Sequence, residues 1–107
     1  MIEEILSIRK FGMSKPRYKW WGFVKAMIRA YPERCNDNER EAVYEALQAL
    51  EDYPMPEVRR QLIAQYFFCK KPISVAADEL HLQCSVAEAW LCNFVYDVWN
   101  RFWAKIC

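Results

Sequence analysis

Basic side chains interleaved with aromatic ones are the part of this sequence best suited to binding chemistry. They fill the first third of the chain, and a short basic pair follows near residue 70. Lysine and arginine neutralise phosphates and aromatic rings stack on bases, so the mixture is typical of nucleic-acid contact. It equally suits basic stems that cover the edge of a tryptophan-rich core. The candidate nucleic-acid-binding residues are Lys15, Arg17, Lys19, Lys25, Arg29, Lys70, Lys71 and Ser85.

Catalytic and metal chemistry find little support in the remaining residues. The single histidine, His81, lies where a helix is expected to end, and only two glycines are available for a phosphate-binding loop. The cysteines are odd in number, with no Cys-x-x-Cys pair, so neither a disulfide framework nor a zinc site of usual spacing is expected. The sequence therefore predicts no enzyme, no cofactor and no metal, and it predicts that most of the thiols are buried, in a reducing compartment.

Charge is distributed unevenly although the net charge is only +1. Residues 1–34 sum to +5, residues 35–57 to −6 and residues 58–107 to +2. A basic third beside an acidic middle makes a dipolar surface, whose basic part either faces phosphate or is simply solvated. No apolar run is long enough for a membrane span and the start is acidic, so we expect no secretory leader and a cytoplasmic location.

The elements that must position these residues are helices. Glycine is scarce, hydrophobic residues make up 54% and their spacing is helical, which predicts one all-α domain over residues 1–107. Its parts are the aromatic and basic helices within 1–34, an acidic helix 37–53 and a helix-turn-helix region at about 56–105. We expect caps at the Asn36–Asn38 cluster and at Ser74, and a capping box from Ser85 to Glu88. The expected helices cover residues 2–11, 17–31, 37–53, 56–69, 75–81 and 85–105.

The segment Pro72–Trp90 has the spacing of a helix-turn-helix. Ala76 and Ala77 are small enough for two helices to cross closely, and Leu80 and Leu82 anchor the turn. A three-helix corner of another kind would carry the same pattern. The second helix of this motif holds no Lys or Arg from Ser85 to Asn100, although a helix that reads bases normally carries such residues.

The chain resembles the phage late-gene transcription regulators of the ArpU/RinA type, whose carboxyl half is similar to region 4 of a sigma factor. Two blocks carry the resemblance: the aromatic, basic block Arg17–Glu33, which ends in Tyr-Pro, and the block Lys70–Phe102. The resemblance implies a DNA-binding helix-turn-helix. Where that family places Arg or Lys on the second helix, this chain has Ser85, Glu88 and Ala89.

Two functions remain open at this point. The first is a DNA-binding transcription regulator, expected to act as a homodimer. The alternative is the same scaffold used as an anti-defence inhibitor of anti-CRISPR type, which blocks a host nucleic-acid-binding protein such as a CRISPR effector. A weaker third is an accessory of RNA polymerase. The last helix is apolar nearly all round, as expected of a central core helix or of a helix that also meets a partner. The candidate protein-interface residues are Glu88, Trp99, Phe102 and Trp103.

Overall fold

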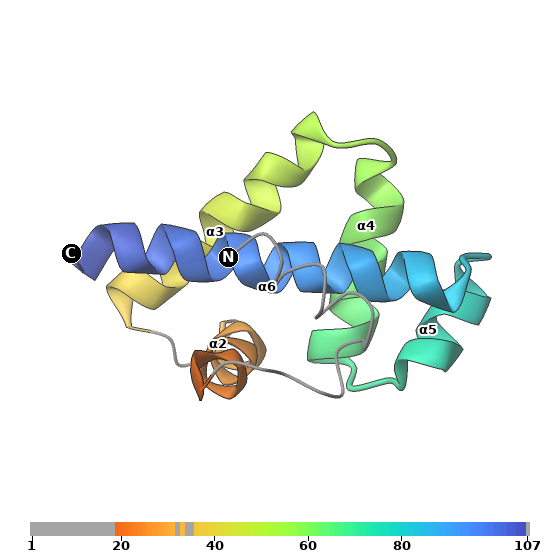
Figure 1. Cartoon of the computed structure of the whole chain (residues 1–107), viewed down its shortest axis with the longest axis horizontal. Coiled ribbons are helices and arrows are strands. Elements are labelled where there is room, and N and C mark those ends of the chain that lie inside the picture. Colours follow the sequence, from red (N-terminus) through yellow and green to blue (C-terminus); the bar gives the residue numbers. More distant parts are fainter. Residues whose placement is uncertain (1–18, 32, 34–35, 107) are drawn as a thin grey trace.

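The chain folds into helices that surround one long helix. The computed structural model describes residues 19–31, 33 and 36–106, and within these residues all regular structure is helical, which confirms the all-α prediction. None of the described helices is both long and apolar enough to cross a membrane. The elements are α2 (Lys19–Ala30), α3 (Asp37–Ala49), the 3₁₀ turn η1 (Leu50–Asp52), α4 (Pro56–Ile63), the π-helix η2 (Ala64–Phe68), α5 (Ile73–Glu79) and α6 (Cys84–Ile106) (Figure 1).

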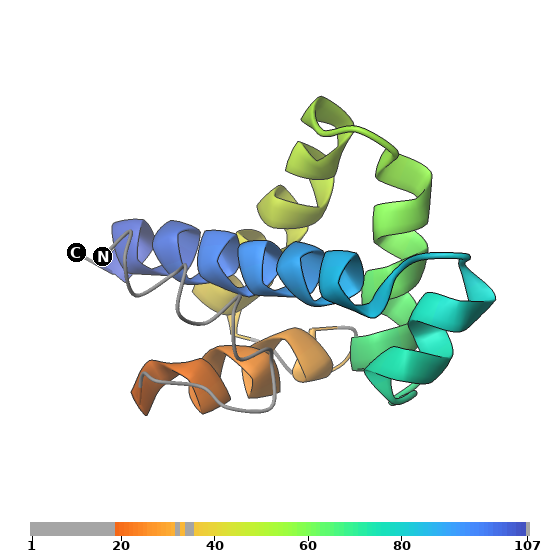
Figure 2. The ribbon, with the colours of Figure 1, turned by 45° about the vertical axis from the view of Figure 1, so that its right-hand side comes forward.

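Helix α6 is the centre of the fold. Its 23 residues run past α2 on one side and past α3 and α4 on the other, and α5 lies at its amino end (Figures 1 and 2). These four neighbours explain why its sequence is apolar nearly all round, because each one covers a different part of its surface. The fully buried positions of α6 are Ala87, Leu91, Cys92, Phe94, Val95, Val98 and Phe102.

The surrounding helices bury the faces that their apolar spacing predicts. In α2 the three-residue and four-residue steps place Trp21, Val24 and Ile28 in the core. Burying one such side chain contributes about 1.5–3 kcal/mol. The same core receives Ala42, Val43 and Ala46 from α3, Leu62 and Ile63 from α4, and Phe67 from η2.

Helix starts agree with the sequence at two places. Asn36 caps α3: its side-chain oxygen accepts from the Glu39 amide at 2.9 Å, and its amide donates to the Glu39 carboxylate at 2.8 Å. Pro56 occupies the first turn of α4, where its missing N–H costs no hydrogen bond.

At two other helix starts the predicted caps are wrong. Helix α5 begins at Ile73, because the extended Pro72 already offers its carbonyl to Ala76 at 3.0 Å, so Ser74 lies inside the first turn. Helix α6 begins at Cys84 and the Ala87 amide donates to Gln83, so Ser85 is helical and cannot form the capping box with Glu88. The expected helix over residues 2–11, and the side chains of Lys15, Arg17 and Lys19, lie outside what the structure describes.

Candidate nucleic-acid interface

A basic pocket lies where the carboxyl end of α2 meets the connection between η2 and α5. Its volume is about 470 Å³, and Arg29, Tyr66, Lys70, Lys71 and Pro72 line it. Three of its five lining residues are cationic and none is acidic. A hollow of this kind attracts an anionic group, because the cations converge on a space that solvent or a ligand fills.

The backbone between η2 and α5 determines where the two lysines lie. In η2 the Cys69 amide donates to Ala64 at 2.9 Å, a π-helical bond, and the Lys71 amide reaches back to Gln65 at 2.9 Å. Lys70 completes this helix end with φ 57°, in the left-handed region that glycine usually occupies. The local winding therefore positions both basic side chains beside Tyr66, at a backbone cost for Lys70.

The cations around the pocket differ in what they already contact. Within the described residues, Arg29 and Lys70 form no ion pair with an acidic side chain. The Lys71 ammonium contacts both carboxylate oxygens of Glu79, at 2.9 and 3.0 Å. The Lys25 ammonium lies 5.7 Å from the centre of the Tyr66 ring, within the range of a cation–π contact.

Four of the residues proposed from the sequence as nucleic-acid contacts thus gather around one ring, although two come from α2 and two from the connection before α5. Ser85 stands apart from them, exposed in the first turn of α6. Sequence reasoning did not include Tyr66 among the candidate contacts. An aromatic residue four positions before the Lys70–Lys71 pair was the available signal, but the π-helical turn that joins them has no sequence pattern that we can name.

The corner between α5 and α6 has the geometry expected of a helix-turn-helix. Ala76 and Ala77 are buried, and Leu80 and Leu82 pack against the core. Helix α5 ends in a Schellman motif: the Leu82 amide donates to Ala77 at 2.8 Å and the His81 amide to Asp78 at 3.1 Å. His81 has φ 58°, so the only histidine serves as a turn residue, as the sequence suggested.

The surface of α6 that would read bases carries no positive charge. Ser85, Ala89, Asn93, Tyr96 and Asn100 follow one line along the helix, and each is exposed or half-buried. We call this set the outward line of α6. It contains no Lys or Arg. Base-edge readout depends strongly on Arg and Lys, and the members of this line with other side chains used for it are Ser85, Asn93 and Asn100.

Next to the outward line of α6, the guanidinium of Arg59 already contacts two aromatic rings. The Arg59 guanidinium lies 4.2 Å from the ring centre of Trp90 and 5.1 Å from that of Tyr53, and its Nε donates to the Pro54 carbonyl at 2.8 Å. Burial lowers the pKa of Arg59, while the Tyr53 hydroxyl opposes that change. Arginine stays protonated at neutral pH, so this sandwich ties the turn after α3 to α6 and leaves the guanidinium planes covered.

Most carboxylates of the acidic segment 37–57 form ion pairs with cations of the same chain. Lys105 contacts Glu45 at 2.8 Å and Glu41 at 3.3 Å, and Arg101 lies 3.7 Å from Glu45. The hydrogen bond to Glu45 is the main cause of a raised pKa at Lys105, and Glu41 adds to it against partial burial. Arg60 in turn binds Glu51 and Glu57. The pairs of Glu41 and Glu45 join α3 to α6, that of Glu51 joins η1 to α4, and together they neutralise part of the negative charge of this segment.

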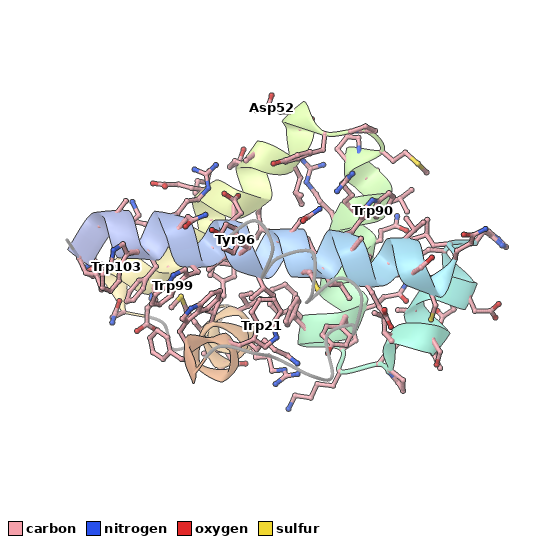
Figure 3. The ribbon with its side chains drawn as sticks, viewed as in Figure 1. Trp21, Asp52, Trp90, Tyr96, Trp99 and Trp103 are labelled. Atoms are coloured by element: carbon pink, nitrogen blue, oxygen red, sulfur yellow. The ribbon has the colours of Figure 1, made fainter. Side chains whose placement is uncertain are left out.

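The protein-interface candidates from the sequence divide between core and surface. Phe102 is buried, and Trp99 is half-buried against Trp20, whose ring is stacked on it at 4.7 Å. Trp103 is 51% exposed and stacks on Trp99 at 5.4 Å. Figure 3 shows Trp99 and Trp103 near the carboxyl end of α6, away from the helix-turn-helix. Glu88 is half-buried at the other end.

Comparison of the chain with protein-family models, with curated proteins and with solved structures finds no match.

Proposed function

We propose that the chain binds the phosphate backbone of double-stranded DNA through its basic pocket, on a helix-turn-helix scaffold of the phage-regulator type. The observation that carries the proposal is the convergence of Arg29, Lys70 and Lys71 on one open pocket that no acidic residue lines. Electrostatic attraction to phosphates supplies most of the affinity of such proteins, and three cations that meet at one place can hold adjacent phosphates together.

The position of the pocket supports this proposal over one in which cations are scattered. Lys70 and Lys71 directly precede α5, the first helix of the motif, which in helix-turn-helix proteins crosses the DNA backbone. Arg29 reaches the same pocket from α2. Phosphate contacts position a protein on the duplex, whereas base contacts specify a sequence. With an outward line that lacks cations, α6 is expected to add little discrimination between sequences.

The regulator interpretation includes a homodimer, and the carboxyl end of α6 is the surface that we propose for it. Phe23, Trp103 and Ile106 are each 46–51% exposed there. The two cations of α6, Arg101 and Lys105, are paired with acids of α3 and with Asp97, so their charges would not repel a second copy. We expect light scattering to give a dimer for the wild type and a monomer for Trp103→Ser; a Trp103→Ser protein of unchanged mass would remove this part of the proposal.

A second candidate function is favoured by one observation, the absence of cations from the outward line of α6. That surface suits a protein partner, as in an inhibitor that covers a host nucleic-acid-binding protein. Such an inhibitor could also use an acidic surface that competes with nucleic acid. The ion pairs that neutralise Glu41, Glu45, Glu51 and Glu57 are evidence against this, because paired carboxylates imitate nucleic acid poorly. The DNA-binding function is therefore the better supported of the two.

The decisive experiment is fluorescence anisotropy of a labelled duplex with the purified chain, from low to moderate salt. Three phosphate contacts predict that the logarithm of the affinity falls with the logarithm of salt concentration with a slope of about −3. Two duplexes of unrelated sequence should bind within a few-fold of each other. Absence of binding at low salt would reject the proposal, and capture of a basic host protein instead would favour the second candidate.

A further inference from the structure

The ion pair between Lys71 and Glu79 ties one cation of the basic pocket to an acid outside its lining. Both oxygens of the Glu79 carboxylate lie within 3.0 Å of the Lys71 ammonium, yet Glu79 is not among the residues that line the pocket. The other two lining cations, Arg29 and Lys70, have no such partner among the described residues. One of the three cations is therefore already neutralised when the pocket is empty.

The position of Glu79 goes against the local preference of its helix. It lies in the last turn of α5, where the carbonyl ends of the helix make a carboxylate unfavourable, and this turn contains no basic residue of its own. An acid at an unfavourable position, bound to a cation of a candidate site, is the kind of local inconsistency that function explains. The Glu79 carboxylate lies beside the Lys71 ammonium, in the place where an anionic ligand of Lys71 would bind.

We propose that Glu79 occupies Lys71 in the free protein and that a phosphate of the bound nucleic acid replaces it. This inference rests on the proposed function. Both side chains of the pair are well exposed, at 37% for Lys71 and 43% for Glu79, so water screens their attraction and the exchange is easy. A phosphate in the pocket meets Arg29 and Lys70 together with Lys71, whereas Glu79 meets Lys71 alone.

The exchange makes the pocket selective for polyanions. A single small anion can meet the same three cations, but it gains no further contacts along a strand. A nucleic acid offers several linked phosphates, so its contacts with Arg29 and Lys70 raise the local concentration of phosphate at Lys71. We therefore expect inorganic phosphate to compete poorly with duplex DNA, and Glu79 to lower the affinity for DNA in the wild type.

The test compares two variants that change the net charge equally. Glu79→Gln removes the internal competitor, and Asp52→Asn removes a carboxylate at the tip of η1, on the opposite side of α6 from α2 (Figure 3). Anisotropy with one labelled 20-base-pair duplex should show affinity about 3–10-fold higher for Glu79→Gln and less than about twofold higher for Asp52→Asn. Adding Lys71→Met to Glu79→Gln should abolish the gain.

The possible failures are distinguishable. If the wild type binds with the expected salt dependence but Glu79→Gln gains no more than Asp52→Asn, the exchange is wrong and the proposed function stands. A gain that persists in the Lys71→Met double variant overturns the exchange in the same way, because the gain would not act through Lys71. If neither the wild type nor Glu79→Gln binds DNA at low salt, the proposed function fails and takes this inference with it.

Discussion

The basic pocket and the outward line of α6 belong to the same helix-turn-helix region, yet their chemistry is opposite. The pocket collects three cations around Tyr66, while the outward line has none from Ser85 to Asn100. In a helix-turn-helix that reads sequence, both surfaces would be basic or polar and would share the DNA. Under the proposed function, this difference means that the chain would position a duplex without specifying its sequence.

The difference has a cause in the packing. Helix α6 is the core of the molecule. Its side chains pack against the four neighbouring helices α2, α3, α4 and α5, so few of its positions remain free for function. Its two cations, Arg101 and Lys105, lie in its carboxyl half and are paired with acids of α3 and, for Arg101, also with Asp97 of α6. The pocket, in contrast, lies at a junction of chain segments where side chains need not fill a core.

The largest expected effect is the loss of stability on truncating a buried side chain of α6. Leu91→Ala should lower the free energy of unfolding by about 2–5 kcal/mol, since its side chain is fully buried and truncation leaves a cavity. Asn100→Ala, on the outward line, should stay within about 0.5 kcal/mol. Urea denaturation measures both changes. Equal losses would contradict the distinction between a buried face and an outward line.

Removing the two pocket cations that form no ion pair among the described residues tests the role of the basic pocket. Arg29→Gln combined with Lys70→Gln should weaken DNA binding roughly 10–100-fold and reduce the salt slope by about 2, because two phosphate contacts are lost. The matched control, Gln48→Glu with Asn38→Asp, lowers the net charge equally at exposed positions of α3, away from the pocket and from the outward line of α6. Similar losses in the two proteins would mean that net charge, rather than the pocket, drives binding.

Adding a cation to α6 would reduce the difference in charge between this helix and the basic pocket. Glu88→Arg should raise the affinity for duplex DNA about 3–10-fold, because it replaces a carboxylate with a phosphate-binding group near the expected groove. Anisotropy under the same conditions gives the answer. Unchanged affinity would show that this end of α6 does not approach the DNA; weaker capture of a host protein would instead favour the inhibitor function.

The two left-handed helix ends provide a matched pair with smaller effects. Lys70 and His81 both adopt positive φ, so Lys70→Gly and His81→Gly should each stabilise the fold by about 0.5–1 kcal/mol. Only Lys70→Gly should also lower DNA affinity, because only Lys70 lines the pocket. Thermal unfolding and anisotropy together separate the effects. Equal affinities for both variants would remove Lys70 from the interface.

The smallest expected effect concerns pH. The pKa of Lys105 is raised above its ordinary 10.5 in the fold, mainly by its hydrogen bond to Glu45. A folded pKa above the unfolded one contributes stability below about pH 10.5, and this contribution is lost as pH rises through the folded value. The stability difference between wild type and Lys105→Met should therefore be constant up to about pH 9 and shrink by pH 11. A constant difference across this range would contradict the role of the charged ammonium.

Much of the fold follows from the sequence, because helical spacing and caps act locally. The apolar steps of Trp21, Val24 and Ile28 identify a buried face, and Asn36 and Pro56 mark helix starts. The predictions for Ser74 and Ser85 failed because the preceding turns, not the capping side chains, determine where α5 and α6 begin.

By itself the sequence determined the helical class, the helix-turn-helix spacing, the basic first third of the chain and the absence of cations from Ser85 to Asn100. These are properties of composition and of short periodicity, which need no knowledge of distant contacts. Only the tertiary structure decided that Arg29 from α2 meets Lys70 and Lys71 beside Tyr66, and that Glu79 holds one of these lysines. Such meetings depend on how helices far apart in the chain cross the central α6, which local spacing does not encode.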